Sequence, residues 1–162
     1  MPEFFCNTSP MQYLHQLKLL PILSELAGNV VVPPAVIDEL EAGKALGINL
    51  PELTTFDWVT IRKPSRSSVL NLLINLGRGE TEVLMLALES NDPIVIFDDG
   101  LARWIAKIHK IRLTGTLGLL IDAKNAGLIP AVKPLLNRLQ TLGFRLAPHT
   151  RTEVLRIANE LP

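Results

Sequence analysis

Short apolar runs alternate along this chain with stretches in which apolar residues recur at helical spacing. The runs at 30–32 and 94–97 are continuous, which is typical of strands buried on both faces, and further short strands are predicted over 3–6 and 111–113. Between them, apolar positions three or four residues apart predict helices. Strands that alternate with helices in this way predict a three-layer α/β/α fold with a mostly parallel central sheet.

Turn and capping residues delimit the individual elements. The first helical stretch (11–26) is broken near Pro21, and Ser9 and Pro10 are the predicted N-cap and first helical residue. Segment 43–55 is predicted to be a loop or a short extra helix. The remaining predictions are edge strands over 58–62 and 144–146, and helices around 36–40 and over 69–76, 80–88, 101–109, 115–126, 132–142 and 152–161.

The length of 162 residues and a hydrophobic content of 48% predict one domain, 1–162, with the helices of about 130–162 as its extension. No apolar run approaches the ~18 residues of a membrane helix. The N-terminus lacks the basic and then apolar pattern of a signal peptide, so we expect a cytoplasmic protein. The single cysteine, Cys6, excludes an internal disulfide and a cysteine-built zinc site, and we interpret it as a core thiol.

The formal net charge is zero, but the charge is unevenly distributed. Residues 1–61 hold seven acids against two Lys or Arg, whereas residues 62–162 hold nine acids against fourteen. The two halves therefore carry about −5 and +5. This balance excludes a globally basic nucleic-acid binder but permits a basic face beside an acidic pocket.

Two adjacent carboxylates follow the most apolar of the predicted strands. Ile94–Phe97 ends at Asp98 and Asp99, at the edge of the sheet where open α/β folds bind ligands. Adjacent carboxylates repel each other, and a divalent metal ion is the simplest partner that holds both. The alternative is that one of them caps the helix 101–109.

Oxygen-bearing side chains also follow the other predicted strands or begin the helices beside them. Oxygen ligands without histidine or thiolate favour Mg²⁺ or Mn²⁺, and a carboxylate-held ion supports phosphodiester hydrolysis. Of Glu80 and Glu82, which face different ways on a helix, Glu80 is the expected ligand; the alternative is that both only complement the helix dipole. The full set is Asn7, Thr8 and Ser9, Glu39, Glu80 and Glu82, Asp98 and Asp99, with Thr116 after the last strand.

Five motifs in order resemble those of the PIN-domain proteins, in a VapC-like subgroup described as predicted nucleic-acid-binding proteins containing a PIN domain. The resemblance covers nearly the whole chain. It implies a PIN-like α/β/α fold, Mg²⁺- or Mn²⁺-dependent cleavage of single-stranded RNA, often a role as the toxin of a toxin–antitoxin pair, and a homodimer. The motifs are NTSPMQYL, VVVPPAVIDEL, LGRGETEVLMLALE, IFDDGLARWIA and LTGTLGLLIDAKNAGLIPAVKPLL.

The resemblance assigns metal and catalytic roles position by position. The family's acidic ligands fall on Asn7, Glu39, Glu80 and either Asp98 or Asp99, of which Asp99 is the better match. Thr8 and Ser9 match the residues that support the first ligand. Asn7 departs from the pattern, because an amide brings no charge and cannot act as a base. The alternative is therefore a catalytically weak or inactive PIN-fold module that binds RNA or a protein.

The helix after the acids offers a possible RNA surface. Arg103, Lys107 and Lys110 are spaced to lie on one helix face, where they could contact RNA phosphates, although a solvated helix face is the favoured explanation. Trp58 and Trp104 are predicted to be core residues.

Two apolar helix faces have no assigned partner. The stripes in 132–142 and 154–158 are either ordinary core or a dimer seam. An antitoxin peptide would be expected to cross the acidic edge with a basic side chain among the carboxylates. A receiver-like phosphoacceptor domain fits poorly, because it needs its acidic pair after the first strand and a lysine after the last.

Overall fold

The computed structural model describes residues 1–65 and 76–162. Within these ranges, five strands form one sheet in the order β3-β2-β1-β4-β5, and every pairing is parallel. The predicted mostly parallel sheet is thus confirmed. The strands are β1 (Glu3–Cys6), β2 (Val30–Val32), β3 (Val59–Ile61), β4 (Pro93–Ile96) and β5 (Arg112–Thr114).

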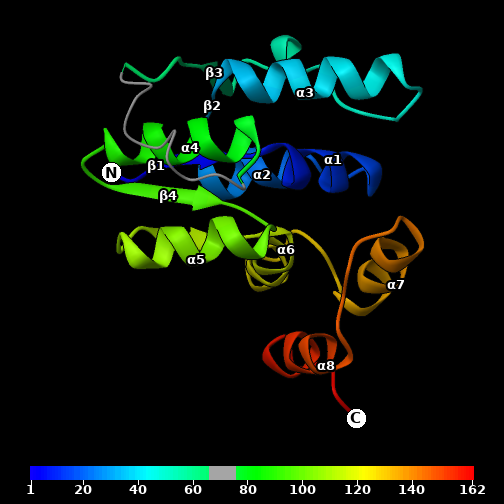
Figure 1. Cartoon of the computed structure of the whole chain (residues 1–162). Coiled ribbons are helices and arrows are strands. Elements are labelled where there is room, and N and C mark those ends of the chain that lie inside the picture. Colours follow the sequence, from blue (N-terminus) through cyan, green and yellow to red (C-terminus); the bar gives the residue numbers. More distant parts are fainter. Residues whose placement is uncertain (66–75) are drawn as a thin grey trace.

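The order of the strands reverses between β1 and β4. The chain begins at β1, moves outward through β2 to β3, and then crosses back to β4 and β5 (Figure 1). In open α/β sheets, the carboxyl ends of the two strands at such a reversal border the ligand-binding crevice. The fold therefore places its crevice between the segments that follow β1 and β4.

Helices cover both faces of this sheet. The helix α3 contacts both α1 and α4. The helix α6 contacts α1 and α2, so it lies on their face. The helices are α1 (Thr8–Gln16), α2 (Pro21–Ala27), α3 (Pro34–Ala45), α4 (Arg78–Leu88), α5 (Gly100–Ile108), α6 (Thr116–Asn125), α7 (Lys133–Thr141) and α8 (Pro148–Ile157), with a 3-10 turn, η1 (Leu53–Thr55).

The core lies where the central strands meet these helices. Phe5, Val95, Ile96 and Phe97 are fully buried, as the continuous apolar runs predict. Each such side chain contributes about 1.5–3 kcal/mol by leaving water. Burial also raises the pKa of the Cys6 thiol well above its ordinary value, which confirms an inert core cysteine.

Most of the predicted elements are confirmed. Three predictions differ from the structure, and one predicted helix lies outside the described residues. The chain enters α1 directly from β1, so Asn7 and not Ser9 occupies the N-cap position. Segment 144–146 is irregular rather than a strand, because it has no strand partner in the described part of the chain. Trp104 is 59% exposed and is not a core residue, since α5 buries the opposite face. The helix predicted over 69–76 lies outside the described residues apart from Leu76, which is not helical.

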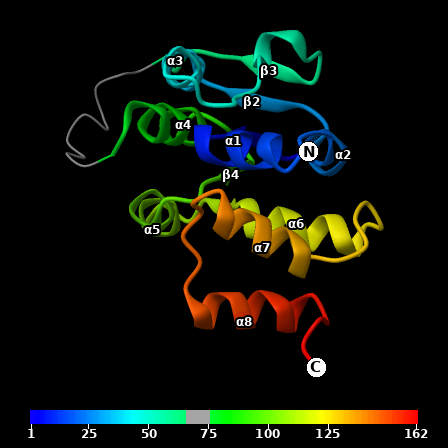
Figure 2. The same cartoon turned by 90° about the vertical axis from the view of Figure 1, so that its right-hand side faces the viewer.

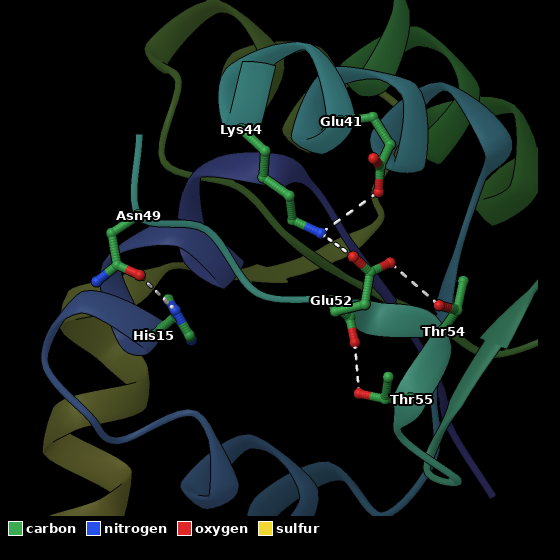
Figure 3. A network of polar contacts seen from close by, with 7 residues as sticks. All are labelled: His15, Glu41, Lys44, Asn49, Glu52, Thr54 and Thr55. Atoms are coloured by element: carbon green, nitrogen blue, oxygen red, sulfur yellow. Dashed lines mark hydrogen bonds and ion pairs between the residues drawn. The ribbon is translucent and has the colours of Figure 1, made fainter. Parts of the chain in front are cut away.

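A polar network fastens the segment between α3 and β3 (Figure 3). Lys44 forms ion pairs with Glu41 and Glu52, and Glu52 also bonds the two threonines of η1. The ring of His15 contacts the Asn49 side chain at 3.0 Å. These groups are exposed, so we interpret the network as a support of the loop.

The C-terminal segment (residues 130–162) lies at the end of the molecule opposite α3 and β3 (Figures 1 and 2). Glu160 fixes it: its carboxylate accepts hydrogen bonds from the backbone N–H groups of Val132 (2.7 Å) and Lys133 (2.9 Å) and from Lys124 Nζ (3.0 Å). A single side chain therefore joins the start of α7 and the end of α6 to the end of the chain. In the part of the chain that the structure describes, no helix combines the length and apolar character that a membrane span requires.

Candidate active site

The ends of β1 and β4 bring Asn7 close to the two aspartates. Cys6 pairs with Ile96 in the parallel register, and the Asn7 N–H donates to Ile96 O at 3.2 Å. β4 ends at Ile96, and Phe97, Asp98 and Asp99 follow it along the chain. The register of two neighbouring strands thus gathers side chains that are about ninety residues apart in the sequence.

Asp98 connects three parts of this edge. Its Oδ2 accepts hydrogen bonds from Ser9 Oγ (2.8 Å) and Thr116 Oγ1 (2.7 Å), and its Oδ1 accepts one from the Thr116 N–H (2.8 Å). Thr116 is fully buried. Ser9 and Thr116 therefore support Asp98, which joins the starts of α1 and α6 to the end of β4.

Asp99 has a different role from its neighbour. Its Oδ2 accepts the N–H of Ala102 at 2.9 Å and so caps α5, while the side chain is exposed. The sequence favoured Asp99 as the metal ligand, and a helix cap was the alternative interpretation for one of the two aspartates. The structure shows that this cap is Asp99, whereas Asp98 is the supported residue. The second oxygen of Asp99 stays available for a ligand.

Asn7 carries a buried acceptor that nothing satisfies. The residue is 4% exposed, and its Oδ1 is the one buried side-chain nitrogen or oxygen without a hydrogen-bond partner among the described residues. Gly79 packs against it: a Cβ at that position would lie 2.7 Å from Asn7 Oδ1 and would collide with Glu39 Oε1. Thr8 Oγ1 donates to the same Glu39 oxygen at 2.6 Å. A glycine is thus required where Asn7 and Glu39 meet α4.

Glu80 stands in a negative environment. Burial is the main cause that raises the pKa of Glu80, and the charges of Glu39 and Asp99 raise it further. Hydrogen bonds from its own backbone N–H and from the Asn7 amide lower the pKa, but by less. The two acids that act on Glu80 come from α3 and from the end of β4. The pKa shift therefore reports that acids from three segments share one edge of the sheet.

Glu82 points away from this edge. Its Oε1 accepts the N–H of Ala35 at 3.3 Å at the start of α3, and Arg78 lies 3.9 Å from its other oxygen. Glu82 therefore contacts the start of α3, and its supporting role at the ligands stays a prediction. Residues two apart on a helix face different ways, and Glu80 occupies the inner position.

A cavity of about 370 Å³ opens over the acidic edge. One wall comes from the C-terminal segment, which the sequence did not associate with the site. Tyr13 and Phe144 close that side, with ring centroids 5.0 Å apart in an edge-to-face arrangement. Burial and the charge of Asp98 raise the pKa of Tyr13. The lining residues are Asn7, Ser9, Tyr13, Glu80, Asp98, Asp99, Gly143, Phe144 and Arg145.

The donors fit a hard divalent cation in kind. Among residues 1–65 and 76–162, no group of three or more His, Cys, Asp or Glu side chains is arranged so that it could hold a metal ion. An asparagine amide stands outside that count, and Asn7 Oδ1 is the buried acceptor that lacks a partner. Carbonyl and carboxylate oxygens without nitrogen or sulfur are the donors that Mg²⁺ and Mn²⁺ prefer.

The three basic residues of the predicted stripe differ in their surroundings. Arg103 is partly buried, and its Nη1 donates to the carbonyl oxygen of Phe97 at 2.8 Å. Lys107 and Lys110 are exposed, and Lys110 lies beyond the end of α5 with a φ of 57°. Arg103 therefore belongs to the candidate site, and contact of the two lysines with RNA stays a prediction.

The sequence predicted the acidic residues of the site but not the aromatic and basic residues that line the cavity. Phe144 and Arg145 lie in none of the five motifs, and Tyr13 lies in the first motif without an assigned role. Neither periodicity nor strand ends single these residues out. The one available signal was the pair of an aromatic and a basic residue in a segment with weak helical character.

Comparison with known proteins gives one match. A family model described as a PIN domain matches residues 3–160. The comparison with curated proteins found no match.

Proposed function

This chain belongs to the PIN-domain family, and we propose that it is a divalent-metal-dependent endoribonuclease that cleaves phosphodiester bonds of single-stranded RNA. PIN domains are generally nucleases. The observation that carries the proposal is the unpartnered, buried Oδ1 of Asn7 beside Glu80, whose pKa is raised by burial and by neighbouring acids. An unsatisfied acceptor and a crowded carboxylate are both stabilised by a bound cation.

We assign Mg²⁺ or Mn²⁺ to Asn7, Glu80 and Asp99, with Glu39 beside them. When bound, the ion would activate a water molecule and neutralise charge on the phosphate. The protein's own groups prepare this edge. Thr8 orients Glu39 through a 2.6 Å hydrogen bond. Asp98 joins the starts of α1 and α6 to the end of β4. Asp98 then has a supporting role rather than a ligand's role.

Metal-dependent cleavage of single-stranded RNA tests the proposal. We expect Glu80→Gln and Asp99→Asn each to lower the cleavage rate in Mn²⁺ on the order of 100-fold or more, because each removes a charged ligand. Glu25→Gln is the matched control, since Glu25 is exposed on α2 and contacts no other side chain in the described ranges. Cleavage that survives both site variants would refute the assignment.

A second candidate function is an RNA- or protein-binding module that does not cleave. Two observations favour it: Asn7 replaces a charged ligand, and the acids alone form no metal site among the described residues. The variant Asn7→Asp separates the two functions. Gain of cleavage over an inactive parent supports the binding module, whereas strong cleavage by the parent excludes it.

We further propose that the protein is the cytoplasmic toxin of a toxin–antitoxin pair and a homodimer. Support comes from the outer face of α5, where Leu101, Trp104 and Ile108 are 38%, 59% and 55% exposed. Such an apolar face suits a protein partner. Light scattering of Trp104→Ala tests the dimer: we expect a monomer, and an unchanged mass would assign the face to another partner. Growth arrest on expression, relieved by a co-expressed antitoxin, tests the toxin.

A further inference from the structure

A second cavity of about 370 Å³ adjoins the acidic one. The two share Asp98, Phe144 and Arg145, so they meet along one wall. The lining differs in charge: the acidic cavity has three carboxylates and one arginine, whereas the second cavity has one carboxylate and two arginines, Arg103 and Arg145. The sign of the charge therefore changes across Asp98.

The positive charge of the second cavity is not neutralised within the protein. In the described part of the chain, neither Arg103 nor Arg145 forms an ion pair with a carboxylate. Arg103 donates to the Phe97 carbonyl oxygen, and Arg145 makes no side-chain hydrogen bond to any residue of the ranges 1–65 and 76–162. The single carboxylate, Asp98, already accepts hydrogen bonds from Ser9 and Thr116. Both guanidinium groups thus keep N–H donors for a ligand.

The position of Arg103 is built into the backbone. A Cβ at residue 115 would lie 2.8 Å from Arg103 Nη1 and 2.7 Å from Phe97 O, so only glycine leaves room for this contact. The hydroxyls of Thr114 and Thr150 add neutral donors to the lining, and Leu117 adds an apolar surface. Two arginines, of which Arg103 is held in place by Phe97 O, lie with hydroxyls beside an apolar patch, and this lining matches a nucleotide phosphate and its sugar or base.

We infer that the second cavity is a subsite for a backbone phosphate of the RNA, adjacent to the scissile phosphate, and that Arg103 and Arg145 hold it. The inference rests on the proposed function, since it takes RNA as the ligand. Two guanidinium groups that face one phosphate make charge-assisted hydrogen bonds, which are stronger than neutral ones. The subsite thereby orients the RNA so that the next phosphate lies over the carboxylates.

Binding of a fluorescein-labelled single-stranded RNA octamer, measured by anisotropy in EDTA, tests the subsite without cleavage. We expect Arg145→Ala to weaken binding about tenfold and to reduce the slope of log K against log salt by about 1, because one phosphate contact is lost. The RNA affinity of Arg145→Lys should lie between those of the wild type and Arg145→Ala, because lysine keeps the positive charge but lacks the paired N–H donors of a guanidinium group. Arg138→Ala is the matched control, because Arg138 is exposed, unpaired in the described ranges and outside both cavities.

The outcomes separate the subsite from the nuclease activity. Loss of binding in Arg145→Ala but not in Arg138→Ala supports the subsite, whether or not the wild type cleaves in Mn²⁺. Equal binding by the wild type and both variants overturns it, even if cleavage is robust. A wild type that does not bind RNA overturns the subsite as well. Complete displacement of the RNA by an equal concentration of uridine monophosphate would assign the cavity to a free nucleotide and also overturn the inference.

Discussion

The carboxyl edge of the sheet and the C-terminal segment line the same cavity by different means. At the edge, Asn7, Ser9 and Asp98 lie within a few residues of the end of a strand, and hydrogen bonds of 2.6–2.8 Å fix Glu39 and Asp98. The C-terminal segment contributes an irregular stretch, 143–145, held by a ring contact to Tyr13 and, farther away, by Glu160. The strand order thus determines where the polar side chains of the site lie, whereas the packing of the C-terminal segment determines the shape of the cavity.

The largest effect is expected where the edge depends on one side chain. Asp98→Ala should lower the free energy of unfolding by about 3 kcal/mol, because it leaves the buried N–H and hydroxyl of Thr116 without an acceptor. Asp99→Ala is the matched neighbour and should cost about 1 kcal/mol, the usual value of a lost N-cap. Urea titration measures both. Equal losses would contradict the division of roles between the two aspartates.

The close contact at Gly79 gives the next effect. Gly79→Ala should destabilise the protein by about 1–3 kcal/mol, because its methyl group would collide with Glu39 Oε1 and crowd Asn7 Oδ1. Gly100→Ala is the control: nothing lies within 4 Å of a Cβ there, and alanine favours the first turn of α5. The midpoints of urea unfolding compare them. If Gly79→Ala were as stable as Gly100→Ala, the tight packing at the edge would be refuted.

The C-terminal segment should respond to loss of Glu160. Glu160→Ala should cost about 1–2 kcal/mol, because it removes the acceptor of two backbone N–H groups and of Lys124. Glu153→Ala breaks only an exposed ion pair with Arg156 and should leave the free energy of unfolding nearly unchanged. Hydrogen exchange should show faster exchange in α7 and α8, with β1 and β4 unchanged. Uniform acceleration would mean that the edge depends on the segment.

Acid should weaken the same attachment. Burial raises the pKa of Glu160, but the N–H groups of Val132 and Lys133 and the Lys124 ammonium together outweigh burial and lower the pKa below 4.5. A lowered pKa gives stability that is present above the ordinary pKa and is lost as the pH falls through the folded-state value. The stability difference between wild type and Glu160→Gln should therefore narrow below about pH 4.5. A constant difference would contradict this linkage.

The smallest effect concerns Glu80. Its raised pKa means that the ionised side chain is disfavoured in the folded protein, so this destabilisation appears as the pH rises above the ordinary pKa of 4.5. Without metal, Glu80→Gln should therefore raise the melting temperature slightly at pH 7 and leave it unchanged at pH 3. Added Mn²⁺ should stabilise the wild type and not the variant. A lower melting temperature for Glu80→Gln at pH 7 would show that Glu80 stabilises the fold.

The sequence predicted much of the acidic edge because its signals are local. A buried strand followed at once by Asp98 and Asp99 indicates a parallel sheet whose carboxyl end presents acids. The sequence did not reveal that Glu82 accepts the N–H of Ala35, because this contact is set by how α3 and α4 pack together. Trp104 was misassigned for a similar reason, since helical spacing does not show which face of α5 is covered.

The sequence by itself determined the alternating strands and helices, the parallel sheet and the set of oxygen-bearing residues at strand ends, because these depend on periodicity and on neighbouring residues. Only the tertiary structure decided which aspartate caps a helix, that Asn7 Oδ1 is buried without a partner, and that Phe144 and Arg145 wall the cavity. These features arise where segments distant along the chain pack together. The contacts that fix them have no spacing that a single sequence can reveal.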